Sequence, residues 1–180
     1  MGTVIYMVPL SLSIATMTLV SQSIGANKPE RAEEIGWSSV FFTTVLCIVI
    51  GIGVWVLRLH LLDLYDPPEA VKVFSIPLFL FIALYQIFDA LQVTAAFILR
   101  AYRVAFWPMV IYACSLWGVG LGGGYLLGFN VLGNTPTFLQ GANGFWAGNS
   151  ISLGLAACLL LYLFRKTAAR FEKTHPPIEV

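Results

Sequence analysis

The sequence predicts an all-α, polytopic membrane protein with five transmembrane helices. Of its 180 residues, 58% are hydrophobic and only 11% are charged, whereas a soluble domain typically has about 25% charged residues. The mean hydropathy is +0.83. The apolar residues also gather into runs of about 20 residues, which is the length that an α-helix needs to cross a bilayer. No segment has the composition of a soluble domain.

The composition also excludes several classes of function. No basic patch with interleaved aromatic residues is present, so nucleic-acid binding is not expected. Cys47, Cys114 and Cys158 lie in three different apolar runs, without metal-ligand or redox spacing. The two histidines, His60 and His175, lie outside the apolar runs. We therefore expect no metal site, no cofactor and no nucleophilic triad.

The first expected span, 3–24, is interrupted by Pro9 and is rich in serine and threonine. These hydroxyls can hydrogen-bond to the helix backbone or line a cavity. The first basic residue is Lys28, and a signal peptide needs a positive n-region, so the segment is interpreted as a spanning helix. Gly25 and Pro29 suit the end of this helix and the first turn of the next one.

The second expected span, 35–57, has Trp37 and Trp55 near its ends, where interfacial aromatic anchors are common. The third expected span is 71–100. At 1.5 Å per residue it would be about 45 Å long, which exceeds the ~30 Å hydrocarbon core. This helix must therefore tilt, bend or protrude from the bilayer.

The fourth expected span, 104–127, carries a series of glycines, and a loop without charge follows it. The fifth expected span, 142–164, opens with Gly144 and Gly148, which lie four residues apart. Small residues at this spacing allow two helices to approach closely. The sequence thus predicts a transmembrane domain that ends near residue 166, with a charged tail after it.

Lysine and arginine positions predict the orientation. Eight of the ten lie at one end of the alternating spans: Lys28, Arg31, Arg100, Arg103, Arg165, Lys166, Arg170 and Lys173. The other two, Arg58 and Lys72, lie at the opposite end. Basic residues concentrate in cytoplasmic segments. We therefore expect a transmembrane domain at 1–166 in the plasma or inner membrane, an external N-terminus and a cytoplasmic tail at 167–180. The absence of flanking charge at the first span suggests further helices upstream.

A polar stripe in the third span is the candidate functional site. Asp89 is the one acidic residue expected deep in the bilayer, about 16 Å along the helix from Arg100. Tyr85, Gln86 and Gln92 lie at offsets of −4, −3 and +3 from it, so they share its face. An ionisable group in a bilayer is costly and usually faces a bundle interior or a water-filled cavity. Asp89 is therefore predicted to bind a cation or a proton, with Gln86 and Gln92 lining a cavity.

A structural role is the alternative for each of these residues. Asp89 could be a neutral acid hydrogen-bonded to a neighbouring helix. Tyr85, Gln86 and Gln92 could join helices through hydrogen bonds. The serine and threonine side chains of the first span are more often packing groups than substrate contacts.

Three stretches together resemble the multidrug and toxic compound extrusion (MATE) family. They are VPLSLSIATMTLVSQSIGANKPERA at 8–32, LYQIFDALQVTAAFILRA at 84–101 and GANGFWAGNSISLGLA at 141–156. They are similar to the second helix of a lobe with the loop after it, to the fourth helix of the C-terminal lobe and to the final helix. Ser21 and Ala101 replace glycines that are common in the family motifs. The match covers nearly the whole chain, in the right order.

Family members have twelve helices in two six-helix lobes and export cationic or amphipathic compounds in exchange for Na⁺ or H⁺. The resemblance implies that this chain is the last five helices, a partial C-terminal lobe. It implies that Asp89 and Tyr85 belong to a site for the coupling Na⁺ or H⁺, completed by a glutamate on the first helix of that lobe. The implied partners are membrane lipid, the missing lobe and helix in cis or in trans, and a small organic cation or drug.

Two hypotheses of function follow from these expectations. In the first, the chain is part of a cation-coupled multidrug antiporter with Asp89 as the coupling residue. In the second, it is a truncated or split membrane subunit that assembles with other helices and transports nothing itself. An intramembrane enzyme is not expected, because a lone acid offers no acid–base or nucleophilic pair.

Overall fold

The computed structural model describes residues 2–65, 69–131, 133, 136 and 140–174, with side chains at 6–57 and from 84 onward within these ranges. The described part is helical and contains no strand, which confirms the predicted fold class. Its elements are α1 (Gly2–Gly25), α2 (Pro29–Tyr65), α3 (Glu69–Ala101), α4 (Phe106–Ala113), the π-helix η1 (Cys114–Gly122), α5 (Gly123–Gly128) and α6 (Ala142–Thr174).

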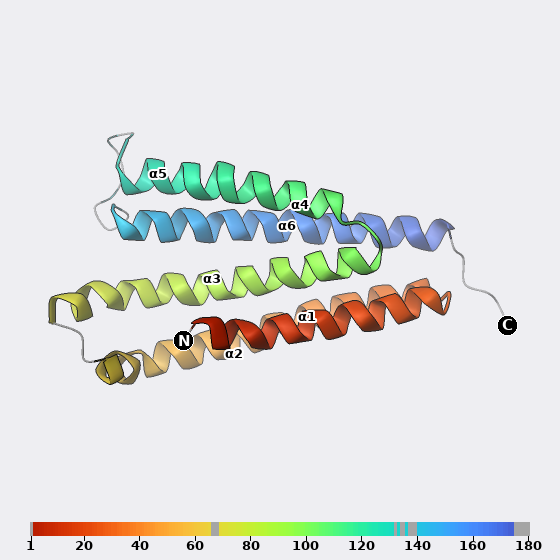
Figure 1. The fold of residues 1–180 in the computed structure, drawn as a ribbon, viewed down its shortest axis with the longest axis horizontal. Coiled ribbons are helices and arrows are strands. Elements are labelled where there is room, and N and C mark those ends of the chain that lie inside the picture. Colours follow the sequence, from red (N-terminus) through yellow and green to blue (C-terminus); the bar gives the residue numbers. More distant parts are fainter. Residues whose placement is uncertain (1, 66–68, 132, 134–135, 137–139, 175–180) are drawn as a thin grey trace.

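The helices lie side by side as long rods (Figure 1). Helices α3 and α6 pack against each other at the centre. Helices α1 and α2 cover α3 on one side, and the continuous rod formed by α4, η1 and α5 covers α6 on the other. Two helices that lie far apart in the sequence, one ending at Ala101 and the other beginning at Ala142, thus pack together at the centre of the bundle.

Four stretches of the described part are long and apolar enough to cross a membrane: Tyr6–Gly25, Pro29–Leu57, Phe106–Gly128 and Ala142–Thr174. The remaining expected span, the third one at 71–100, corresponds to α3, a helix of 33 residues whose side chains before residue 84 lie outside the description. Helices α2 and α6 both continue beyond the expected spans 35–57 and 142–164. Part of the expected tail is therefore helical, as far as Thr174.

Helix α1 continues through Pro9 and is not interrupted there. Neighbouring helices and serine or threonine hydroxyls let a membrane helix tolerate proline. The hydroxyl of Ser13 donates to the carbonyl oxygen of Pro9 at 2.8 Å, and the hydroxyl of Thr16 donates to that of Leu12 at 2.8 Å. The Ser13 hydroxyl is also 3.0 Å from that of Thr94 on α3. These hydroxyls thus serve packing and backbone hydrogen bonding.

Close backbone contact joins α6 to the rod beside it. A Cβ atom added at Gly148 would lie 2.6 Å from the backbone nitrogen of Gly124 and 2.8 Å from its Cα atom. A Cβ atom at Gly120 would lie 2.8 Å from the hydroxyl oxygen of Ser152. The close packing predicted for the start of the fifth span is therefore found at Gly148, against glycines of η1 and α5.

An aromatic cluster closes the other end of α6. The side chain of Phe164 is completely buried, and its ring centroid lies 5.2 Å from that of Trp37 on α2 and 6.0 Å from that of Tyr102 after α3. The ring covers Gly36, where an added Cβ atom would meet the Phe164 Cζ atom at 2.6 Å. Phe171, two turns further along α6, makes an edge contact with Tyr102 at 5.6 Å. The cluster holds the end of α6 against α2 and α3.

The sequence predicts a single spanning helix at 104–127. The structure has a rod there, but this rod is not a regular α-helix throughout. Its middle, Cys114–Gly122, is a π-helix of 9 residues. Such wide turns are rare and occur frequently at functional sites. Glycines at 118, 120 and 122 lower the barrier to this geometry, because they carry no side chain to crowd the preceding turn. The π-helix packs against α6, and it lines one cavity together with Tyr85 of the polar stripe.

Candidate functional site

Asp89 lies near the middle of the described part of α3, and its side chain is only 7% exposed. Gln92, one turn further along, donates from Nε2 to Oδ1 of Asp89 at 3.3 Å. This distance is at the long end for a hydrogen bond to a carboxylate. The structure therefore brings together Asp89 and Gln92 of the predicted stripe. The carboxyl group can still accept a further hydrogen bond or bind a cation.

Asp89 points toward the interior of the bundle and not toward lipid. It interacts electrostatically with Tyr85 on its own helix, with Tyr6 on α1 and with Cys47 on α2. Cys47 is completely buried, so the acid lies beside a packed part of the bundle. Tyr85 interacts in the same way with Tyr6 and with Tyr112 on α4. Phenol groups from α1 and α3 thus lie within electrostatic reach of one carboxyl group, and the phenol group of Tyr112 on α4 lies within reach of both of them.

Gln86 carries a polar group for which the described residues provide no partner. Its side-chain nitrogen is buried and has no hydrogen-bond partner among them. A buried donor without a partner costs about 1–3 kcal/mol of stability. Such a group is expected where a ligand, water or a further helix completes the hydrogen bonding. This position on α3 therefore suits a polar contact from outside the described part of the chain.

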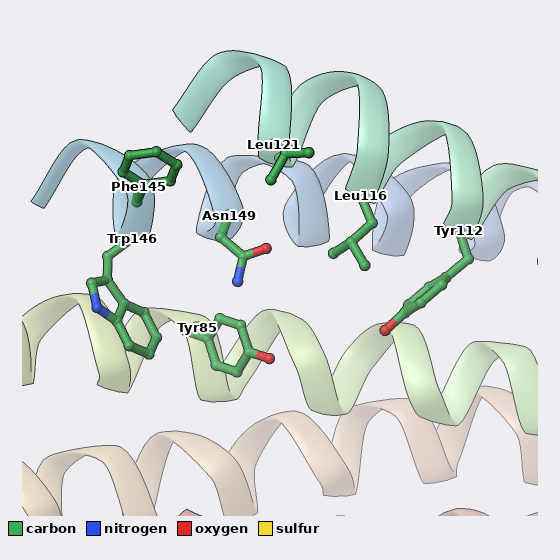
Figure 2. A pocket seen from close by; sticks show the side chains of 8 residues that line it. Tyr85, Tyr112, Leu116, Leu121, Phe145, Trp146 and Asn149 are labelled. Atoms are coloured by element: carbon green, nitrogen blue, oxygen red, sulfur yellow. The ribbon is translucent and has the colours of Figure 1, made fainter. Parts of the chain in front are cut away.

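A cavity of about 380 Å³ lies between α3, the α4–η1 rod and α6. Figure 2 shows Tyr85 on α3 facing Trp146 and Asn149 on α6, with Tyr112 reaching toward α3 from α4. The rings of Tyr85 and Trp146 meet edge to face, with their centroids 5.7 Å apart. The remaining lining consists of Leu116, Gly120, Leu121 and Phe145. Leu116, Gly120 and Leu121 all belong to η1, so the π-helix forms one wall of the cavity.

Of the predicted site residues, Tyr85 lines this cavity, whereas Asp89, Gln86 and Gln92 are not among its lining residues. Tyr85 therefore belongs to two neighbouring environments. Its ring contributes to the cavity wall, and its phenol group lies within electrostatic reach of Asp89. The acid and the cavity are adjacent parts of one region of the bundle, joined by this side chain.

Of the eight residues that line the cavity, sequence reasoning singled out only Tyr85 as a site residue. Among those it missed are Tyr112, Trp146 and Asn149. Asn149 carried a signal, because an amide side chain within an apolar span is unusual. Tyr112 and Trp146 carried none, since aromatic residues occur throughout the chain. Their faces are electron-rich and attract cations. With Asp89 close by, this arrangement can hold a small inorganic cation or a proton at the acid and an apolar or cationic molecule beside it.

Comparison with known proteins gives consistent matches. The family model MatE matches residues 2–126. The chain is 38% identical over 172 residues to "Probable multidrug resistance protein NorM" of Aromatoleum aromaticum, covering 94% of this chain and 36% of that protein. It is 32% identical to multidrug resistance protein PmpM of Pseudomonas aeruginosa, covering 97% of this chain and 36% of that protein. The chain thus spans little more than a third of the length of these relatives.

A solved structure shows the same arrangement of helices. The crystal structure of the eukaryotic MATE transporter AtDTX14 matches 96% of this chain with a TM-score of 0.80 and 22% sequence identity. The match covers 38% of that chain. At this identity the likeness establishes the fold alone. The fold is that of part of one lobe, as the order of the three sequence stretches predicts.

Proposed function

The chain belongs to the MatE family, and from this premise we propose that it is the C-terminal part of a cation-coupled multidrug antiporter in which Asp89 binds the coupling Na⁺ or H⁺. The family consists of transporters and not of enzymes. One observation carries the assignment of the coupling residue. Asp89 is an acid that is buried in the middle of an apolar bundle, and such residues usually mark ion or proton pathways.

The arrangement around Tyr85 supports an exchange mechanism. Asp89 can hold either a proton or a cation, and the change between these states alters the charge beside Tyr85. Tyr85 also forms part of the cavity wall with Trp146. An organic cation or drug bound against these rings would therefore respond to the state of Asp89. Gln92 orients the carboxyl group, and Gln86 offers a buried donor for a further polar contact.

Transport requires partners that this chain does not supply. A secondary transporter of this kind moves two halves against each other around a central site. The chain covers 36% of its NorM relative, which corresponds to less than one half. The missing lobe and the first helix of the C-terminal lobe are proposed to join it in cis or in trans. The alternative is a truncated or split membrane subunit with no transport activity of its own.

Export from cells tests this function. Expressed alone in a drug-sensitive host, the chain should confer no resistance, because a single incomplete lobe cannot alternate its access. Fused behind the preceding helices of the Aromatoleum relative, it should restore resistance and ion-driven efflux of a fluorescent organic cation. The preceding helices alone serve as the control and should be inactive. An inactive fusion that is correctly inserted would contradict the proposal.

Resistance from the chain alone would contradict the need for partners. The oligomeric state would then decide between two explanations. A dimer would indicate a half-transporter that completes itself, and a monomer would overturn the view that this lobe is incomplete.

The predicted orientation has a separate test. Because eight of the ten basic residues lie at one end of the spans, we expect the C-terminus in the cytoplasm and the N-terminus outside. A reporter that is active only in the cytoplasm should be active after Thr174 and inactive when inserted at Gly133, between α5 and α6. Moving the reporter to Lys28 provides a second cytoplasmic position. Activity at Gly133 would show that the orientation or the number of spans is wrong.

A further inference from the structure

Helix α6 is longer than a membrane span. Its 33 residues correspond to about 50 Å, whereas the hydrocarbon core is about 30 Å thick. The apolar part, 142–164, is sufficient to cross this core. Residues 165–174 therefore extend through the headgroup region, and Figure 1 shows α6 continuing past the end of α3.

This extension carries four basic residues, and all of them are exposed: Arg165, Lys166, Arg170 and Lys173. At 100° per residue they fall within an arc of about 140° on one side of the helix. We call these four residues the basic stripe. The one acidic residue of the segment, Glu172, is also exposed and lies at the edge of this arc. Charge of one sign is thus concentrated along one face of α6.

The opposite face of the extension is held by the bundle. Phe164 is completely buried and Ala168 is 3% exposed. Phe171 makes its edge contact with the ring of Tyr102 at 5.6 Å. Because these contacts prevent the extension from turning or fraying, the basic stripe faces outward in a defined direction.

The basic stripe continues an apolar face that is exposed within the span. Ile151, Leu155, Leu159 and Tyr162 are 58%, 41%, 41% and 68% exposed. At 100° per residue they fall within the same arc of α6 as the basic stripe. We call these four residues the apolar lane. A phospholipid has this same order of chemistry along its length, with apolar chains in the core and a charged headgroup at the boundary.

We propose that the apolar lane and the basic stripe together bind an anionic phospholipid of the leaflet at this end of the bundle. The acyl chains lie along the lane, and the headgroup phosphate pairs with Arg165 and Lys166, which follow the lane directly. The guanidinium group of Arg165 can bind a phosphate through two parallel hydrogen bonds. Arg170 and Lys173 lie further out and attract the anionic membrane surface. An acidic protein would match the stripe but not the lane, so the observations favour a lipid.

Cys158 gives a direct measurement, because it is exposed and lies on the arc of the lane. The full chain with Cys114→Ser is labelled with a fluorophore at Cys158 and reconstituted in vesicles of equal parts phosphatidylglycerol and phosphatidylcholine. Bromine on the acyl chains of one lipid at a time then quenches the label. We expect brominated phosphatidylglycerol to quench more strongly than brominated phosphatidylcholine, and added salt to reduce the difference.

Charge variants separate the basic stripe from basic residues elsewhere. Arg165→Gln with Lys166→Gln should lower the preference for phosphatidylglycerol by up to about fivefold per cation. Lys28→Gln with Arg31→Gln, at the same end but on the side of α6 opposite the basic stripe, where α2 packs against Phe164, should leave it unchanged. Glu172→Lys should raise the preference for phosphatidylglycerol, and misfolding of the variant could not produce such a gain. Equal quenching by the two lipids, or a preference that survives the Arg165 and Lys166 changes, would overturn the proposal. So would the absence of any gain in Glu172→Lys.

Discussion

Replacing Asp89 with asparagine is expected to abolish ion-driven export by the assembled transporter while leaving expression and membrane insertion intact. Asparagine has nearly the same shape as aspartate but cannot exchange a proton or carry a charge. Its side-chain oxygen can still accept the hydrogen bond that Gln92 donates to Oδ1 at 3.3 Å. The change therefore removes the charge and preserves the packing. An acid at the centre of a membrane helix disfavours insertion by roughly 2.5–3.5 kcal/mol on the insertion scale. Because the substitution removes this acid, membrane insertion should not be impaired.

Efflux of a fluorescent organic cation under an imposed Na⁺ or H⁺ gradient measures this effect. Asp89→Glu is expected to keep partial activity, since it retains a carboxyl group. Tyr85→Phe should weaken coupling less than Asp89→Asn, because it removes a hydroxyl and leaves the charge. Normal export by Asp89→Asn under the imposed gradient would show that Asp89 is a packing residue.

Thr94→Val provides a matched control on the same helix. Thr94 is completely buried, and its hydroxyl lies 3.0 Å from that of Ser13, away from the contacts of Asp89. Losing this contact should cost about 1 kcal/mol of stability and leave ion coupling intact. A loss of coupling in Thr94→Val equal to that in Asp89→Asn would mean that any disturbance of α3 inactivates the transporter.

Gly148→Ala is expected to destabilise the bundle by about 3 kcal/mol, at the upper end of the usual cost of overpacking. The added Cβ atom would lie 2.6 Å from the backbone nitrogen of Gly124. The nearest atoms that it would meet belong to the backbone of Gly124 and not to a flexible side chain. The two helices themselves must therefore separate. The cavity lies between the same helices, and its walls would move as well. Thermal unfolding of the purified chain in detergent should show a lower midpoint.

Gly154→Ala on the same helix is the matched control. A Cβ atom at Gly154 would first meet the ring of Phe88 at 3.5 Å, which is an ordinary van der Waals contact. Alanine in place of glycine in a helix interior stabilises by roughly 0.5–1 kcal/mol. The two substitutions are chemically identical and are expected to have opposite signs. If both lowered the unfolding midpoint equally, the contact between Gly148 and Gly124 would not be the cause.

Local chemistry made much of the fold predictable. Apolar runs of membrane length identify the helices, because a bilayer leaves every backbone hydrogen bond to be satisfied within the span. The turn between the first two helices followed from Gly25 and Pro29, which do end α1 and begin α2. Asp89 was recognisable as a candidate site residue because an ionisable group is costly in lipid and usually faces the bundle interior or a cavity.

The faces of the helices were not predictable in this way. Lipid chains are as apolar as leucine, so a side chain that packs inside the bundle and one that faces lipid can look the same in the sequence. Phe164 is completely buried and Phe41 is 72% exposed, yet both stand in apolar runs. For this reason Tyr112 and Trp146 could not be recognised as cavity residues, and the continuation of α6 beyond its span was not expected.

Polar offsets along one helix placed Tyr85, Gln86 and Gln92 on the face of Asp89, and the hydrogen bond from Gln92 follows from that spacing. Other features depend on how separate helices pack. They are the position of Asp89 within electrostatic reach of Tyr6 and Cys47, the π-helical wall of the cavity and the contact between Gly148 and Gly124. Spacing along the chain is a local property that the residues carry themselves. Packing between helices follows from shape complementarity over the whole bundle, and so it became visible only in three dimensions.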